Sequence, residues 1–148
     1  IISTASMTVK TYLGFDVGTK RTGIAIANSL TSHASGIDTV LHHKDGSTNW
    51  TKLDLIISQH KADAFIVGLP LDLENKEQEM TFIARSFGRK LAKRFNVDVV
   101  FIDEHLSSSE AKKQLKWHYA HKNADRGDVD KRSAELILQT WLNETTHD

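Results

Sequence analysis

The hydrophobic pattern of the first forty residues predicts strands. In residues 12–27 (YLGFDVGTKRTGIAIA), apolar side chains alternate with other residues on both sides of a turn at residues 18–21. Such alternation is typical of two half-buried strands joined by a tight turn. Residues 36–41 carry a weaker form of the same pattern. Three strands therefore precede the first predicted helix, which favours an antiparallel meander.

A helix and a buried strand are predicted next. Residues 49–60 place apolar side chains on one helical face, with Ser47 or Thr48 as the expected N-cap. Residues 64–68 (AFIVG) form a continuous apolar run, which indicates a strand buried on both faces in the centre of a sheet. The Gly-Leu-Pro sequence at residues 68–70 is expected to end this strand in a loop.

The second half of the chain continues the alternation. Asn75 is expected to cap a helix that runs to Phe95, and residues 97–102 predict a fifth strand followed by Asp103 and Glu104. The expected apolar stripe of that helix is Met80, Ile83, Ala84, Phe87, Leu91 and Phe95. A meander followed by helix-linked strands predicts an α/β fold with a mixed five-stranded sheet and helices on both faces.

Two further helices are predicted towards the end of the chain. Ser107 and Glu110 have the spacing of a capping box, which opens a helix over residues 107–119. Residues 120–127 read as a polar loop, and residues 129–143 as the last helix. Its inward stripe is Ala134, Ile137 and Trp141.

Carboxylates mark the ends of the predicted strands. Asp16 ends the first strand, and Asp103 and Glu104 follow the fifth. Asp130 lies on the inward stripe of the last helix, one helical step before Ala134. Clustered carboxylates repel one another unless a cation neutralises them, and oxygen ligands suit Mg²⁺ or Mn²⁺. Alternatively, Asp16 is a turn residue and Asp130 a helix-dipole residue of the first turn.

Composition narrows the possible chemistry. The chain has 148 residues, a formal net charge of zero and no cysteine. We therefore expect one domain over residues 7–148, and thiolate or zinc–cysteine chemistry is excluded. Residues 1–6 precede Met7 and are expected to be a disordered leader or a cloning remnant. No apolar run approaches the length of a membrane span, so we expect a soluble, cytoplasmic protein without a membrane partner.

Four motifs in order resemble one family. FDVGTKRTGIA, VGLPL, DEHLSS followed by Glu110-Ala111, and VDKRSAELIL resemble the YqgF or RuvX family of pre-16S ribosomal RNA nucleases over residues 9–143. The resemblance implies a ribonuclease H-like fold related to the Holliday junction resolvases. It also implies one or two Mg²⁺ or Mn²⁺ ions and catalytic, metal-binding roles for Asp16, Glu104 and Asp130, with Asp103 as a further candidate ligand. His105 stands where the family usually has Arg.

Basic residues are candidates for binding nucleic acid. Lys20 and Arg21 lie close beyond Asp16 and could hold a phosphate of the cleaved strand, as could His105. A basic and aromatic segment further along could contact the backbone and stack on bases. Within it the candidates are Lys112, Lys116 and Arg126. The alternative for all of them is a solvated surface.

Three functions remain open. The resemblance implies processing of the 5′ end of the small-subunit ribosomal RNA precursor, with RNA and ribosomal particles as partners. Cleavage of branched DNA, as by a Holliday junction resolvase, is the first alternative. A catalytically silent RNA- or ribosome-binding module is the second, and an ATP-binding protein the third, because Asp16, Gly18 and Thr19 also resemble the phosphate hairpin of sugar kinases. The pattern does not decide between a monomer and a homodimer.

Overall fold

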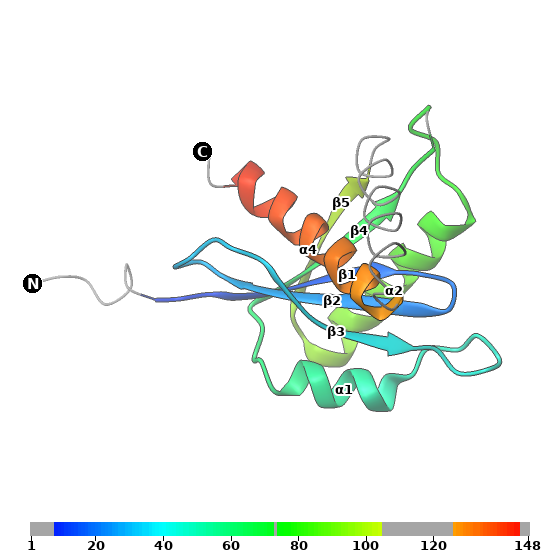
Figure 1. Cartoon of the computed structure of the whole chain (residues 1–148), viewed down its shortest axis with the longest axis horizontal. Helices are drawn as coiled ribbons and strands as arrows, with labels where there is room; N and C mark the ends of the chain where they lie inside the picture. Colours follow the sequence, from blue (N-terminus) through cyan, green and yellow to red (C-terminus); the bar gives the residue numbers. More distant parts are fainter. Residues whose placement is uncertain (1–7, 73, 105–125, 146–148) are drawn as a thin grey trace, which may run out of the picture.

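Five strands form one mixed sheet in the order β3-β2-β1-β4-β5. The computed structural model describes residues 8–72, 74–104 and 126–145. Strands β1, β2 and β3 are an antiparallel meander, and β4 and β5 run parallel to β1 (Figure 1). The strands are β1 (Thr11–Val17), β2 (Arg21–Asn28), β3 (Ser35–Leu41), β4 (Ala64–Pro70) and β5 (Asp98–Glu104). This confirms the expected α/β class and mixed five-stranded sheet.

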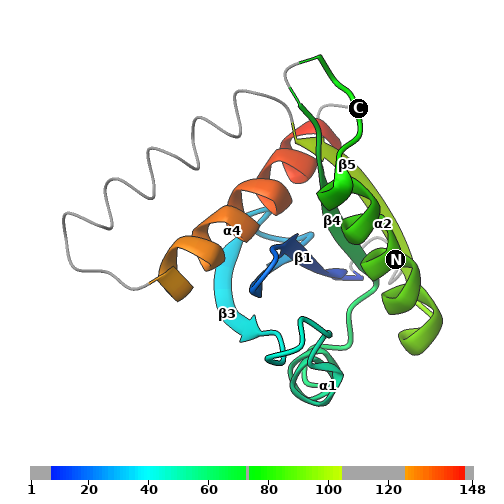
Figure 2. The same ribbon diagram turned by 90° about the vertical axis from the view of Figure 1, so that its right-hand side faces the viewer.

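Helices cover both faces of the sheet. The helices are α1 (Trp50–Ser58), α2 (Glu79–Phe95) and α4 (Arg126–Thr145). Helix α4 lies on one face, and α1 and α2 lie on the other (Figures 1 and 2). Within the described parts of the chain, no helix is long and apolar enough to cross a membrane.

Strand alternation assigns the side chains of β1 to these two faces. Leu13 and Phe15 are fully buried in the cluster that contains α1 and α2. Gly14 lies under α4, because a Cβ at this position would meet Leu138 at 2.8 Å. Successive side chains point to opposite faces of a strand, so Asp16 lies on the same face as Gly14. The sheet therefore turns a carboxylate towards α4.

Two of the three predicted helix caps are wrong, and the third, at Ser107, lies outside the described residues. Asn49, rather than Ser47 or Thr48, caps α1, and its side chain accepts a hydrogen bond from the Lys52 backbone at 3.2 Å. Helix α2 begins three residues later than expected. Gln78 and Thr81 form its capping box, whereas Asn75 sits in a turn with φ of 62°. An Asn in the left-handed region is typical of a turn. Each of the two helices is therefore capped by a different nearby polar residue from the one that the sequence predicts.

The predicted stripe of α2 is also partly wrong. Ile83 is 41% exposed, and the buried positions are Thr81, Ala84, Phe87, Gly88 and Leu91. Thr81 is accommodated because its hydroxyl donates to the Pro70 carbonyl. A hydrogen-bonded hydroxyl can be buried at a helix start where a bare polar group could not.

Strands β4 and β5 extend further than expected. The ladder between them continues to Pro70 and Glu104. Pro70 is tolerated because β1 pairs with β4 only up to Val67, so Pro70 lies where one side of the strand has no partner strand. Asp103 and Glu104 are thus the last two residues of β5. Helix α4 begins at Arg126, so residues 126 and 127 are helical and not part of a loop. The predicted helix at residues 107–119 and the loop up to residue 125 lie outside the described residues.

We predict that Gly23→Ala separates α4 from the sheet. A Cβ on Gly23 would lie 2.1 Å from the Asp130 carbonyl oxygen, and backbone cannot move as a flexible side chain does. We expect a loss of about 3 kcal/mol or more in the free energy of unfolding, measured by urea denaturation. Gly46→Ala is the control, because nothing lies within 4 Å of its Cβ and only the positive φ of 89° opposes it. Equal losses in the two variants would contradict the steric account.

Candidate active site

Asp16 lies near the end of β1, directly opposite Gly23 of β2. Paired residues of neighbouring strands point to the same face, so both face α4. Gly23 presents no side chain there, and the backbone of Asp130 occupies the space that a Cβ would fill. The missing side chain brings the first turns of α4 down beside Asp16.

Glu104 reaches the same face from β5. It is the last residue of the strand and only 6% exposed. Its carboxylate lies over Gly68 of β4, because a Cβ there would meet Oε2 of Glu104 at 2.9 Å. Phe15 is in register with Val67, so Asp16 is level with Gly68. Neighbouring strands are about 4.8 Å apart, which places the Glu104 carboxylate one strand away from Asp16.

Asp130 lies in the early part of α4 and is paired with an arginine. The Nε of Arg21 donates a hydrogen bond to Oδ2 of Asp130. The two side chains are 22% and 21% exposed, so the pair is largely shielded from solvent. Asp130 therefore lies in the inward position expected from the sequence, and the positively charged guanidinium of Arg21 lies beside it.

The chemistry of these three donors fits a hard divalent cation. Asp16, Glu104 and Asp130 offer only carboxylate oxygens, the ligands that Mg²⁺ and Mn²⁺ prefer. Their side chains are not arranged as a ready ligand set: within residues 8–72, 74–104 and 126–145, no three His, Asp or Glu side chains form one. A cation held by all three carboxylates at once would require them to move relative to one another.

Asp103 is turned away from this face. Its neighbour Phe101 packs on Gly88 of α2, so odd-numbered residues of β5 face α1 and α2. Asp103 is exposed on that side, whereas Glu104 is buried on the side of α4. The expectation that Asp103 is a further ligand loses its geometric support.

The structure describes only some of the residues that are expected to contact nucleic acid. Lys20 is exposed in the turn between β1 and β2, and Arg21 begins β2. Arg126 is the first residue of α4. His105, Lys112 and Lys116 lie outside the described residues.

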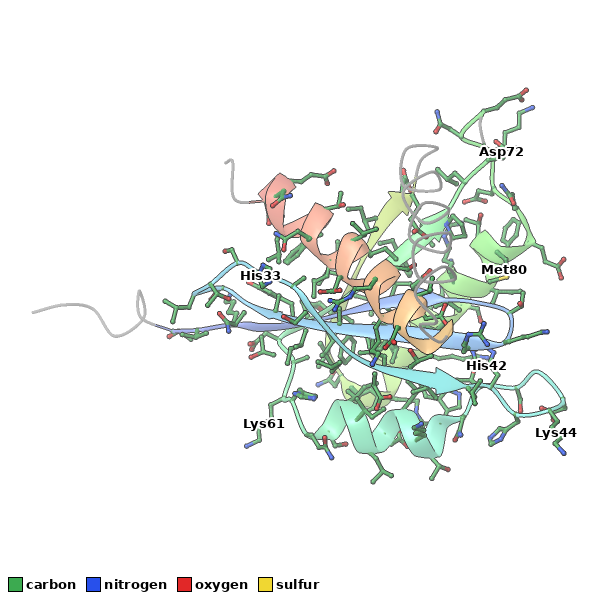
Figure 3. All side chains as sticks on the ribbon, in the orientation of Figure 1. His33, His42, Lys44, Lys61, Asp72 and Met80 are labelled. Carbon is green, nitrogen blue, oxygen red and sulfur yellow. The ribbon has the colours of Figure 1, made fainter. Side chains whose placement is uncertain are left out.

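A histidine supports the turn that carries Lys20. The backbone of His42 donates to the Lys20 carbonyl at 2.8 Å, and its Nε2 lies 3.1 Å from the hydroxyl of the buried Thr22. Figure 3 shows His42 beside the end of the β1–β2 hairpin. Burial lowers the pKa of His42, against the opposing effect of a hydrogen bond with the Thr19 backbone; the neighbouring His43 lowers it slightly further.

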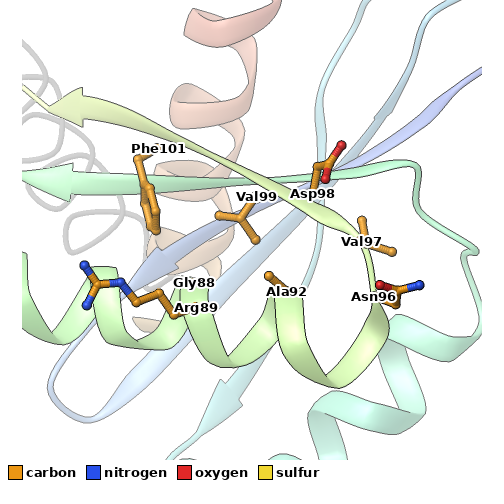
Figure 4. Close-up of a pocket in the computed structure, with 8 residues that line it drawn as sticks. All are labelled: Gly88, Arg89, Ala92, Asn96, Val97, Asp98, Val99 and Phe101. Carbon is orange, nitrogen blue, oxygen red and sulfur yellow. The ribbon is translucent and has the colours of Figure 1, made fainter.

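A shallow pocket of about 370 Å³ lies on the opposite face of the sheet, between α2 and β5 (Figure 4). It is lined by Arg89, Val99 and Phe101 among others. Because these β5 side chains face α2, the pocket is separated by the sheet from the three carboxylates. It therefore does not belong to the candidate active site.

Comparison with known proteins decides the family. The RuvX family, described as Holliday junction resolvase, matches residues 10–144. The chain belongs to the RuvX family. A relative from Aeromonas salmonicida named "Putative pre-16S rRNA nuclease" is 38% identical over 93% of this chain and 98% of its own length. A relative from Coxiella burnetii with the same name is 39% identical over 89% and 92%. The family resemblance of the four motifs is confirmed.

A solved structure confirms the fold of this RuvX-family chain. Thermus thermophilus RuvC in complex with a Holliday junction substrate superposes with a TM-score of 0.57 at 12% identity. The superposition covers 93% of this chain and 96% of RuvC. At this low identity the likeness establishes the ribonuclease H-like architecture alone.

Sequence reasoning missed three contributors to the site. The pattern places Gly23 in a strand and predicts for Gly68 only the end of a strand, although a glycine within a strand often marks the close approach of another segment. Arg21 is a predicted phosphate-binding residue, and its pairing with Asp130 is not part of that prediction. No sequence signal connects residues 109 positions apart in this way.

We predict that His42 makes the stability of this RuvX-family protein depend on pH. Its pKa is lowered in the folded state, so the unfolded chain takes up the proton first as the pH falls. The stabilisation is therefore present above about pH 6.5 and is lost as the pH falls towards the pKa of the folded state. Urea unfolding of the wild type and of His42→Gln, each at pH 8 and pH 5.5, measures this difference. The wild type should lose more stability than the variant, and an identical loss would contradict the assignment to His42.

Proposed function

We propose that this protein is a metal-dependent nuclease that processes the 5′ end of the small-subunit ribosomal RNA precursor. The observation that supports the proposal is that Asp16, Glu104 and the helix α4 that carries Asp130 lie on the same face of the sheet, in a chain of the RuvX family. The names of the most similar relatives support the ribosomal substrate. A cytoplasmic site of action and one domain over residues 7–148 are part of the same proposal.

The three carboxylates are proposed to hold one or two Mg²⁺ or Mn²⁺ ions. Such an ion, when bound, lowers the pKa of water and stabilises the negative charge of a reacting phosphate. Asp16 lies in β1 and Glu104 in β5, and the hydrogen-bonded sheet holds the backbones of both residues in place. Asp130 approaches from α4, so its contribution depends on the seat of α4 on Gly23.

Lys20 and Arg21 are proposed to place the phosphates of the substrate. Both belong to the hairpin that also carries Asp16, so they lie at the end of the sheet where the carboxylates gather. Cations beside a phosphodiester neutralise part of its charge and raise affinity in a salt-dependent manner. His105, Lys112, Lys116 and Arg126 extend this proposal to residues whose side chains the structure does not describe.

Cleavage of a four-way DNA junction is the second candidate function. The description of the family favours it, as does the structural likeness to RuvC. RNA and branched DNA present the same phosphodiester chemistry to the carboxylates. The choice of substrate therefore depends on surfaces other than the three acids.

The test compares both substrates directly. The purified full chain is incubated with a ribosomal RNA precursor or a four-way DNA junction, with Mn²⁺ or with EDTA. We expect cleavage only with Mn²⁺, and a loss of about 100-fold or more in Asp16→Asn, Glu104→Gln and Asp130→Asn. Undiminished cleavage in EDTA would reject the metal mechanism.

A matched control separates the site from general charge effects. Asp103→Asn removes a carboxylate next to Glu104 in sequence but on the opposite face of β5. It should retain cleavage within about threefold of the wild type, because an exposed carboxylate far from the reacting phosphate is screened by solvent. RNA binding that survives all three site variants, with no cleavage by the wild type, would instead favour a silent binding module.

A further inference from the structure

We propose that Arg21 and a divalent cation compete for Asp130, so that Arg21 must release this carboxylate before the cation binds. In this exchange Asp130 passes from the guanidinium to the cation, and Arg21 becomes available to a phosphate of the nucleic acid. The inference rests on the proposed function, because it concerns the same carboxylates. It gives Arg21 two successive partners and couples cation binding to substrate binding.

The position of Arg21 makes the pair a product of the fold. Arg21 lies two residues before Gly23 on β2, so both point towards α4. Gly23 seats the backbone of Asp130, and the Nε of Arg21 then meets the carboxylate of the same residue. One strand thus fixes both the backbone and the side chain of Asp130.

Burial makes the pair a real competitor of a cation. With about one fifth of each side chain exposed, solvent screens the two charges less than it would at the surface. A guanidinium bonded to Asp130 also repels a divalent cation approaching that carboxylate. Binding of the cation at this face is therefore weakened until Arg21 moves away.

Release leaves Arg21 close to the place where a phosphate is needed. Arg21 follows the turn that carries the exposed Lys20, at the end of β1 that carries Asp16. A planar guanidinium recognises phosphate oxygens with two parallel hydrogen bonds. The cation and the phosphate therefore favour the same movement of Arg21.

Cation binding without nucleic acid tests the exchange. The affinity of the full chain for Mn²⁺ is measured by electron paramagnetic resonance of free Mn²⁺, for the wild type, Arg21→Gln and Lys20→Gln. Arg21→Gln should bind Mn²⁺ about tenfold more tightly, because the competitor of the cation is gone. Lys20→Gln removes the same charge from an exposed neighbour, so its affinity should change by less than about twofold.

A second pair of variants identifies the carboxylate concerned. In the Asp130→Asn background, Arg21→Gln should leave Mn²⁺ affinity unchanged, because the competition is for Asp130. Arg21→Lys keeps the charge but loses the Nε donor, so it should fall between the wild type and Arg21→Gln. It also keeps the test decisive if Arg21→Gln does not fold, which circular dichroism reveals.

Two results overturn the inference in distinguishable ways. If Asp16→Asn and Asp130→Asn weaken Mn²⁺ binding but Arg21→Gln leaves it unchanged or weaker, Arg21 supports the ligands and the exchange is rejected while the proposed site stands. If Asp16→Asn and Asp130→Asn bind Mn²⁺ as the wild type does, the proposed cation site itself is wrong, and the exchange with it.

Discussion

The close seat of α4 on the sheet is the contact on which the candidate site depends. Gly14 and Gly23 let the helix approach at positions where any side chain would collide with it. The apolar part of this contact stabilises the fold through residues such as Leu138 and Ile137, both buried. The polar part seats the backbone of Asp130 on Gly23, the strand partner of Asp16. Removing space at one glycine would therefore affect stability and chemistry together.

The two faces of the sheet differ in the side chains that they carry. On the face of α1 and α2, large apolar side chains interlock, with Phe15 packed edge-on against Phe65 and Phe87. On the face of α4, small residues such as Ala25 and Ala134 pack beside larger ones such as Leu138. Carboxylates are costly to bury, and the apolar clusters on both faces of the sheet offset that cost. The Arg21–Asp130 pair offsets part of that cost.

The sequence was sufficient for the fold class and for the succession of the described strands and helices, but not for the contacts between distant segments. Alternation in residues 12–27 predicts the hairpin, and helical spacing places Asp130 inward, since both depend on local periodicity. Element ends were less predictable, because Asn49 and Gln78 competed with neighbouring polar residues for the capping role. Pairing of Arg21 with Asp130 depends on where α4 crosses the strands, and no local pattern contains that information.

Strand register connects these observations. Asp16 faces Gly23, and Glu104 lies over Gly68, only because each ladder is aligned as it is. A slip of one residue would turn Asp16 into the apolar core and Phe15 towards α4. The hydrophobic pattern that opposes such a slip therefore also positions the carboxylates. The same strand alignment positions the residues that stabilise the sheet and the residues proposed to act on phosphate. A change of register that altered the site would therefore also disrupt the fold.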